Sequence, residues 1–198
     1  MHPPEPLGQL LCQIRACAVC ADHLELGPRP IVQAAPTARV LVIGQAPGRR
    51  VHESGVPWDD PSGRRLREWL GLTDHEFYDP GTVALVPMGF CFLGSTTSGD
   101  RPPRPECAPL WHARLLAALG DIRLTVLIGT YALARYLPGS GPRLTDTVAQ
   151  WRQHLPDRAV LPHPSPRNRR WLASNPWFED EAVPAIRSRV REVVDRDE

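Results

Sequence analysis

The chain has 198 residues, of which 42% are hydrophobic, and its 23 basic and 22 acidic residues leave a formal net charge of +1. Every basic residue is an arginine, because the sequence contains no lysine. The composition therefore excludes enzymes that need a lysine side chain to form a Schiff base or to bind phosphate in a P-loop. Arginine still favours the planar, bidentate recognition of phosphate or carboxylate groups.

The length predicts a single domain that spans residues 1–198. No apolar run approaches the roughly 18 residues that cross a membrane. The segment from Met1 to Leu11 lacks the charged start and long apolar centre of a signal peptide. We therefore expect a cytoplasmic protein that has no membrane partner. We also expect a monomer.

Four short apolar runs predict buried strands, and their continuous hydrophobicity is typical of a sheet that is covered on both faces. These runs are residues 39–44, 82–87, 124–129 and 158–162. Helical patterns are found at 62 to about 70, with Ser62 as the cap, at about 107–119, from near 130 to before Pro138, and from about 179 to the C-terminus. Alternating strands and helices predict an α/β fold, a three-layer α/β/α sandwich around a four-stranded, mostly parallel sheet.

Ligands of such sheets bind beyond the carboxyl ends of the strands, so the loops that follow the strands are the candidates for a site. The first loop reads Gly44-Gln45-Ala46-Pro47-Gly48, and its glycines allow the backbone to approach a ligand closely. The last loop holds His163 between two prolines. Polar and basic residues follow it: Ser165, Arg167, Asn168, Arg169 and Arg170. A histidine beside arginines suits a site that contacts phosphate and stabilises developing negative charge.

The five cysteines form a second pattern. Cys17 and Cys20 make a CxxC pair, and Cys91 and Cys107 are separated by fifteen residues. Four thiolates with this spacing can hold zinc or an iron–sulfur cluster, although two unrelated cysteine pairs would give the same pattern. Cys12 is left over and is predicted to be a small buried residue.

The Gly-Gln-Ala-Pro-Gly loop, the His-Pro-Ser-Pro-Arg-Asn loop at 163–168 and the four cysteines together resemble the uracil-DNA glycosylase superfamily. The cysteine layout is similar to that of its iron–sulfur branch, the family-4 enzymes. The resemblance covers residues 17–168 and implies a 4Fe–4S cluster on Cys17, Cys20, Cys91 and Cys107. It also implies that DNA is the partner.

The resemblance also implies roles for individual residues. His163 would stabilise the departing base, Trp58 would stack on a base flipped out of the duplex, and Gln45 with Asp59 and Asp60 would orient the attacking water. Base-binding residues would be Gly44, Ala46, Pro47, Gly48, Trp58 and Met88. The DNA backbone would meet Ser165, Arg167, Asn168, Arg169 and Arg170.

The implied activity is that of a monofunctional DNA glycosylase, a hydrolase of base-excision repair, and uracil is the first expected base. Three positions differ from the family pattern. Gln45 stands where family-4 enzymes carry an acidic residue, and Ala46 stands where other branches have a catalytic Asp or Asn. Pro87 stands where the family has an asparagine that reads the uracil edge. A proline offers only its carbonyl. Two alternatives therefore stay open: a glycosylase for hypoxanthine or xanthine, and a catalytically inactive module that binds damaged or single-stranded DNA.

Overall fold

A four-stranded parallel sheet forms the centre of the computed structural model, which describes residues 5–97, 99–139 and 143–195. The strands lie in the order β2-β1-β5-β6, and every neighbouring pair is parallel. All four match the predicted runs: β1 (Val40–Ile43), β2 (Val83–Leu85), β5 (Leu124–Ile128) and β6 (Arg158–Leu161).

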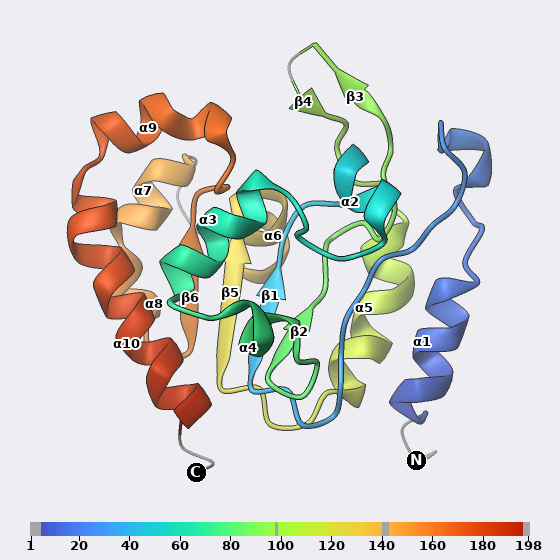
Figure 1. Cartoon of the computed structure of the whole chain (residues 1–198), viewed down its shortest axis with the longest axis horizontal. Helices are drawn as coiled ribbons and strands as arrows, with labels where there is room; N and C mark the ends of the chain where they lie inside the picture. Colours follow the sequence, from blue (N-terminus) through green and yellow to red (C-terminus); the bar gives the residue numbers. More distant parts are fainter. Residues whose placement is uncertain (1–4, 98, 140–142, 196–198) are drawn as a thin grey trace.

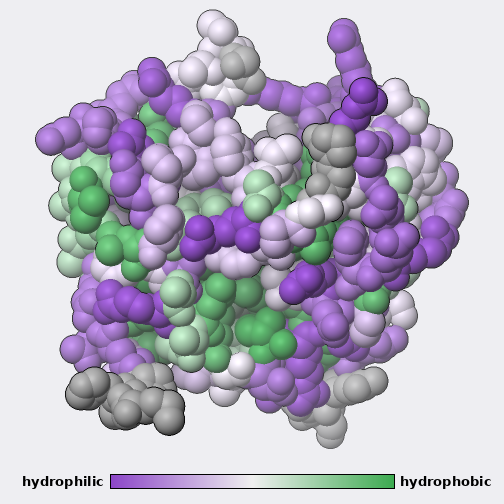
Figure 2. Space-filling view, turned by 180° about the vertical axis from the view of Figure 1, so that it is seen from behind, coloured by the Kyte–Doolittle hydropathy of each residue, from purple (hydrophilic) through white to green (hydrophobic). Residues whose placement is uncertain are grey.

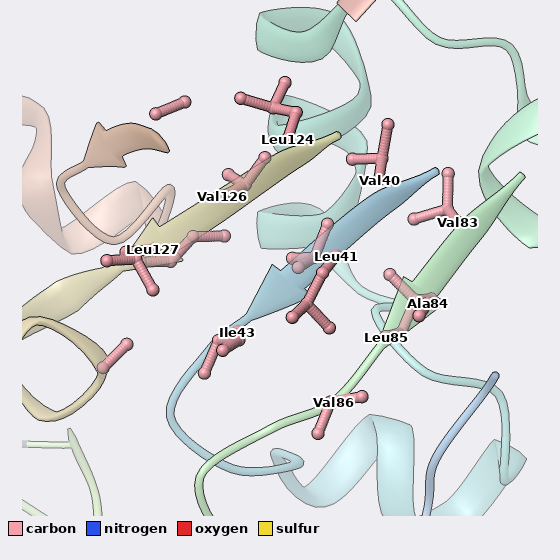
Figure 3. Close-up of a cluster of buried hydrophobic side chains, with 14 of the residues drawn as sticks. Val40, Leu41, Ile43, Val83, Ala84, Leu85, Val86, Leu124, Val126 and Leu127 are labelled. Atoms are coloured by element: carbon pink, nitrogen blue, oxygen red, sulfur yellow. The ribbon is translucent and has the colours of Figure 1, made fainter. Parts of the chain in front are cut away.

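The strands are apolar along their length because both faces of the sheet are covered. All residues of β1 and β2 are buried, as are Val126, Leu127 and Ile128 of β5. Figure 3 shows side chains of β1, β2 and β5 lying against one another on neighbouring strands. The α/β sandwich expected from continuous hydrophobicity is therefore confirmed.

Helices form a layer on each side of this sheet (Figure 1). Helix α3 lies in front of the strands, and α10 packs against both α3 and β1. Helix α6 lies behind the strands, beside α5, and α1 packs against α5. The bounds of these helices are α1 (Leu7–Arg15), α3 (Pro61–Leu70), α5 (Cys107–Ala118), α6 (Gly129–Tyr136) and α10 (Val183–Val194).

Shorter elements connect these layers. A two-stranded antiparallel hairpin, formed by β3 (Ser95–Thr96) and β4 (Gly99–Asp100), projects beyond the upper end of the sheet in Figure 1. The other short elements are η1 (Ala21–His23), α2 (Arg49–Ser54), α4 (Asp74–Tyr78), α7 (Leu144–Ala149), α8 (Trp151–His154), η2 (Pro166–Asn168), α9 (Arg169–Ser174) and η3 (Phe178–Ala182).

The four predicted helices are present, with differences at their ends. Asp60, not Ser62, caps α3, because its carboxylate accepts the Gly63 N–H at 2.7 Å and Pro61 occupies the first turn. The last predicted helix begins as the π-helical turn η3, and its final residues, 196–198, lie outside the described part of the chain. Cys12 is exposed, contrary to the prediction, because α1 buries the opposite face through Leu10 and Ile14.

No helix within residues 5–97, 99–139 and 143–195 combines the length and the apolar character needed to cross a bilayer.

A buried histidine joins α5, α6 and the end of β2. His112 is 1% exposed, its Nδ1 lies 2.5 Å from the Tyr136 hydroxyl, and its Nε2 lies 3.0 Å from the Pro87 carbonyl. A carbonyl oxygen only accepts, so we assign the ring proton to Nε2, and Nδ1 accepts from Tyr136. Burial lowers the pKa of His112 to about 4, against a usual value of 6.5.

This lowered pKa predicts a stability that depends on pH. Between pH 6.5 and 4 the unfolded chain binds a proton at His112 that the folded chain does not bind. The free energy of unfolding should therefore fall with the pH across this window, by up to about 3 kcal/mol from this group. Urea denaturation at several pH values should show a smaller fall for His112→Gln than for the wild type. Parallel curves for the two proteins would contradict this account.

Candidate active site at the carboxyl ends of the strands

A pocket of about 250 Å³ lies where the loops after β1, β2 and β6 meet. Ten of the residues singled out in the sequence line it: Gly44, Gln45, Ala46, Pro47, Gly48, Trp58, Asp60, His163, Ser165 and Arg167. Parallel strands end at the same edge of a sheet, which is why loops that are far apart in the sequence share this pocket. Seen from behind in Figure 2, the upper edge of the molecule has an opening between the hairpin and hydrophilic residues on the side of α9.

Five of the candidate residues do not line this pocket: Asp59, Met88, Asn168, Arg169 and Arg170. Met88 is buried in the core, and its backbone N–H donates to the Gly44 carbonyl at 2.9 Å. Arg169 and Arg170 begin α9 on the exposed surface beside the pocket. Arg169 and Arg170 thus lie outside the pocket, on the exposed surface.

Trp58 lies against the first loop and the histidine. Its Cζ2 atom is 2.7 Å from the position that a Cβ on Gly44 would occupy, so only glycine leaves room for the indole. The rings of Trp58 and His163 are 5.9 Å apart between centroids and tilted by 31°. Trp58 has a φ of 59°, and among the described non-glycine residues none other has a positive φ. Strain of this kind is found mostly at functional sites.

The start of α3 holds the backbone of Trp58 in this conformation. A Cβ on Gly63 would lie 1.7 Å from the Trp58 carbonyl oxygen, which means that the two segments touch through their backbones. The Asp60 cap on the Gly63 N–H fixes the same turn. Asp60 therefore has a structural role in addition to its place in the pocket wall.

His163 sits on a rigid loop. Pro162 and Pro164 flank it, and the Asn168 side-chain amide donates to the His163 carbonyl at 2.7 Å. Burial lowers the pKa of His163, and the negative charges of Asp60 and Asp100 oppose this effect only in part. The ring is consequently uncharged at neutral pH and can donate one N–H.

Asp100 is a pocket residue that the sequence did not reveal. It comes from β4 of the hairpin, and its Oδ2 atom lies 3.2 Å from the position that a Cβ on Gly48 would take. The residues around it match no motif, so no local signal marks it. The one indirect signal is its place between Cys91 and Cys107, the segment that forms the hairpin.

The four predicted cysteines line one small cavity, together with residues of the chain between β2 and the hairpin. Burial raises the pKa of Cys91 to about 11 and that of Cys107 to about 12, and it also raises the pKa of Cys20. The Phe90 N–H points at the Cys107 sulfur at 3.4 Å. Most of the remaining wall is apolar, with Leu24, Phe90, Leu93 and Trp111 among its residues, and Arg104 adds one cation.

In the described part of the chain, no three side chains of the types His, Cys, Asp and Glu are arranged to hold a single metal ion. The four predicted cysteines nevertheless share one largely apolar cavity. Sulfur ligands in an apolar setting fit iron–sulfur chemistry.

Comparisons with known proteins agree with this architecture. The family model described as "Uracil DNA glycosylase superfamily" matches residues 31–187. A protein of Thermotoga maritima named "Type-4 uracil-DNA glycosylase" is 24% identical over 173 residues, which cover 83% of this chain and 85% of that protein.

The contact between Gly63 and Trp58 predicts a strong effect of one methyl group. Gly63→Ala should lower the free energy of unfolding by about 1–3 kcal/mol, because the new Cβ displaces the Trp58 carbonyl. Gly8→Ala is the matched control: nothing lies within 4 Å of its Cβ position in α1, and the change should raise stability by about 0.5–1 kcal/mol. Urea denaturation measures both. A Gly63→Ala protein as stable as the wild type would refute the contact.

Proposed function

Because the chain belongs to the uracil DNA glycosylase superfamily, we propose that it hydrolyses the bond between deoxyribose and a deaminated base in DNA, with uracil as the first candidate. The observation that carries the proposal is the pocket that joins His163, Trp58 and the loop 44–48 at one edge of the sheet. These residues supply a hydrogen-bond donor, an aromatic surface and a close backbone approach.

His163 acts on the leaving group. Breaking the glycosidic bond places negative charge on the base and positive charge on the sugar. A donor that is already aimed at the base stabilises this transition state more than the ground state. The uncharged ring of His163 donates an N–H to the base as it leaves. The lowered pKa of His163 therefore suits the role.

Trp58 and the first loop hold the base. The target must leave the duplex, because its glycosidic bond is not reachable inside the stack. Trp58 offers an aromatic ring beside His163 for the flipped base, and Gly44 lets that ring approach the loop. Gln45 and Asp60 line the same pocket and orient the attacking water.

The arginines beside the pocket bind the DNA backbone. Arg167 lies in the pocket wall, and Arg169 with Arg170 lies on the adjoining surface of α9. Ser165 and Asn168 shape the loop that carries Arg167. The Ser165 hydroxyl accepts a hydrogen bond from the Arg167 N–H at 3.2 Å, and the Asn168 amide donates to the His163 carbonyl at 2.7 Å. With a net charge near zero, DNA binding rests on this local group and weakens with salt.

Cys17, Cys20, Cys91 and Cys107 would hold a 4Fe–4S cluster, as the resemblance implies and the shared cavity supports. The cluster would supply no chemistry to the hydrolysis and would tie the N-terminal segment to the two ends of the hairpin.

The missing lysine limits the reaction. Because the sequence contains no lysine, no lysine amine can form a Schiff base with the sugar. The expected product is an uncut abasic site.

A second substrate class is favoured by one contact. Pro87 lines the pocket, but its carbonyl already accepts a hydrogen bond from His112, which does not line it. Residue 87 is a proline, so the protein has no asparagine at this position to recognise the edge of uracil. Hypoxanthine and xanthine are therefore the second candidates.

One panel tests the activity. Labelled oligonucleotides that contain uracil, hypoxanthine or xanthine are incubated with the protein and then treated with alkali, which cuts abasic sites. We expect only the uracil strand to be cut, and we expect this cut only after the alkali treatment. Cleavage confined to the other two bases would select the second candidate, and binding without cleavage would indicate an inactive DNA-binding module.

His163→Ala should reduce the single-turnover rate by roughly 10²–10³-fold, as the loss of a donor to a developing anion does. His75→Ala is the control, because His75 is exposed on α4 and does not line the pocket. Equal rates for the His163→Ala protein and the wild type would disprove the assigned role.

The cluster has its own test. Anaerobically purified protein should be brown, contain iron and sulfide, and absorb broadly in the visible range. Cys17→Ser should lose this absorption, whereas Cys12→Ser should keep it, because Cys12 is exposed on α1 and does not line the cavity. A colourless protein that contains zinc would contradict the cluster.

A further inference from the structure

The hairpin brings a carboxylate to the pocket that the first loop lacks. The Ser95 hydroxyl donates to Asp100 Oδ1 at 2.7 Å, and Ser95 and Asp100 face each other across the two strands. The other oxygen, Oδ2, is directed at Gly48 of the first loop. Within the described residues no side chain or N–H bonds to this oxygen.

Asp60 and Asp100 are the two carboxylates among the described residues of the pocket wall. One oxygen of Asp60 is committed to the Gly63 N–H at 2.7 Å. Gln45 and Ala46 of the first loop carry no charge. Asp100 thus has the carboxylate oxygen that is most available to a water molecule.

The position of Asp100 suits an attack on the sugar. Asp100 is exposed while lining the pocket, which places it at the mouth. When a base fills the pocket, the sugar stays at the mouth, and the water must approach there. His163 lines the same pocket, close enough for the charge of Asp100 to act on it.

A hydrogen bond holds the base of the hairpin against the first loop. The Gln45 side-chain amide donates to the Arg101 carbonyl at 3.4 Å, next to Asp100, and the Arg101 N–H closes the hairpin base by donating to the Gly94 carbonyl at 3.0 Å. From the other side, Arg167 Nη1 lies 2.6 Å from the position that a Cβ on Gly99 would take. Asp100 is therefore fixed between the two loops that carry the proposed chemistry.

We infer that Asp100 is a further catalytic residue, the general base that takes a proton from the attacking water. The water oxygen bonds to C1′ of the sugar while its proton passes to the Asp100 carboxylate. The electron pair of the broken bond leaves with the base, whose anion is stabilised by His163 and then protonated by solvent. Asp100 returns its proton to solvent. This inference rests on the proposed function.

Asp100→Asn tests the assignment, because it keeps the shape and the bond from Ser95 but removes the base. We expect the single-turnover rate on a uracil oligonucleotide to fall roughly 10²–10⁴-fold. The Kd for an oligonucleotide with 2′-fluoro-2′-deoxyuridine, which resists hydrolysis, should stay within threefold of the wild type. Added formate should restore part of the activity of Asp100→Ala. Asp121→Asn, in an exposed ion pair with Arg123, is the control and should match the wild type.

Three results would overturn the assignment: an Asp100→Asn rate within twofold of the wild type, a Kd that weakens as much as the rate falls, or no effect of formate. A wild-type protein that cleaves none of the three bases would instead reject the proposed function, and with it this inference. An active wild type with an active Asp100→Asn variant rejects the inference alone.

Discussion

The parallel alignment of four strands is the constraint on which the pocket depends. Because β1, β2, β5 and β6 all point the same way, the loops after β1, β2 and β6 are delivered to one edge. The side-by-side pairing of β1, β2 and β5, whose buried side chains are drawn in Figure 3, fixes that edge. Short loops then suffice to bring together residues that lie more than a hundred positions apart, such as Gln45 and His163.

A second constraint is steric. Trp58 meets glycine on both sides: its indole lies over Gly44 and its carbonyl lies over Gly63. The positive φ of Trp58 costs free energy of the order of 1–3 kcal/mol, which the surrounding contacts must offset. The site therefore trades stability for a fixed aromatic wall, in the manner of other preorganised sites.

The sequence predicted the four strands of the central sheet, the helices α3, α5, α6 and α10, and the shared place of the two loops, since each leaves a local pattern. It did not predict α1. It could not predict contacts made across the fold. Asp100 shows no motif, and its place became evident only once the hairpin returned to Gly48. The prediction of Ser62 as the cap was wrong because α3 begins two residues earlier, after Asp60. The prediction that Cys12 is buried was wrong because a different face of α1 packs against the core. The roles assigned to individual site residues stay predictions.

The hairpin between Cys91 and Cys107 connects two chambers that share no residue in the described chain. One chamber is lined by thiols, and the other is the pocket that Asp100 enters. Cys91 and Cys107 both line the thiol chamber and lie on either side of Asp100 in the sequence. One short stretch of chain therefore contributes to the walls of both chambers.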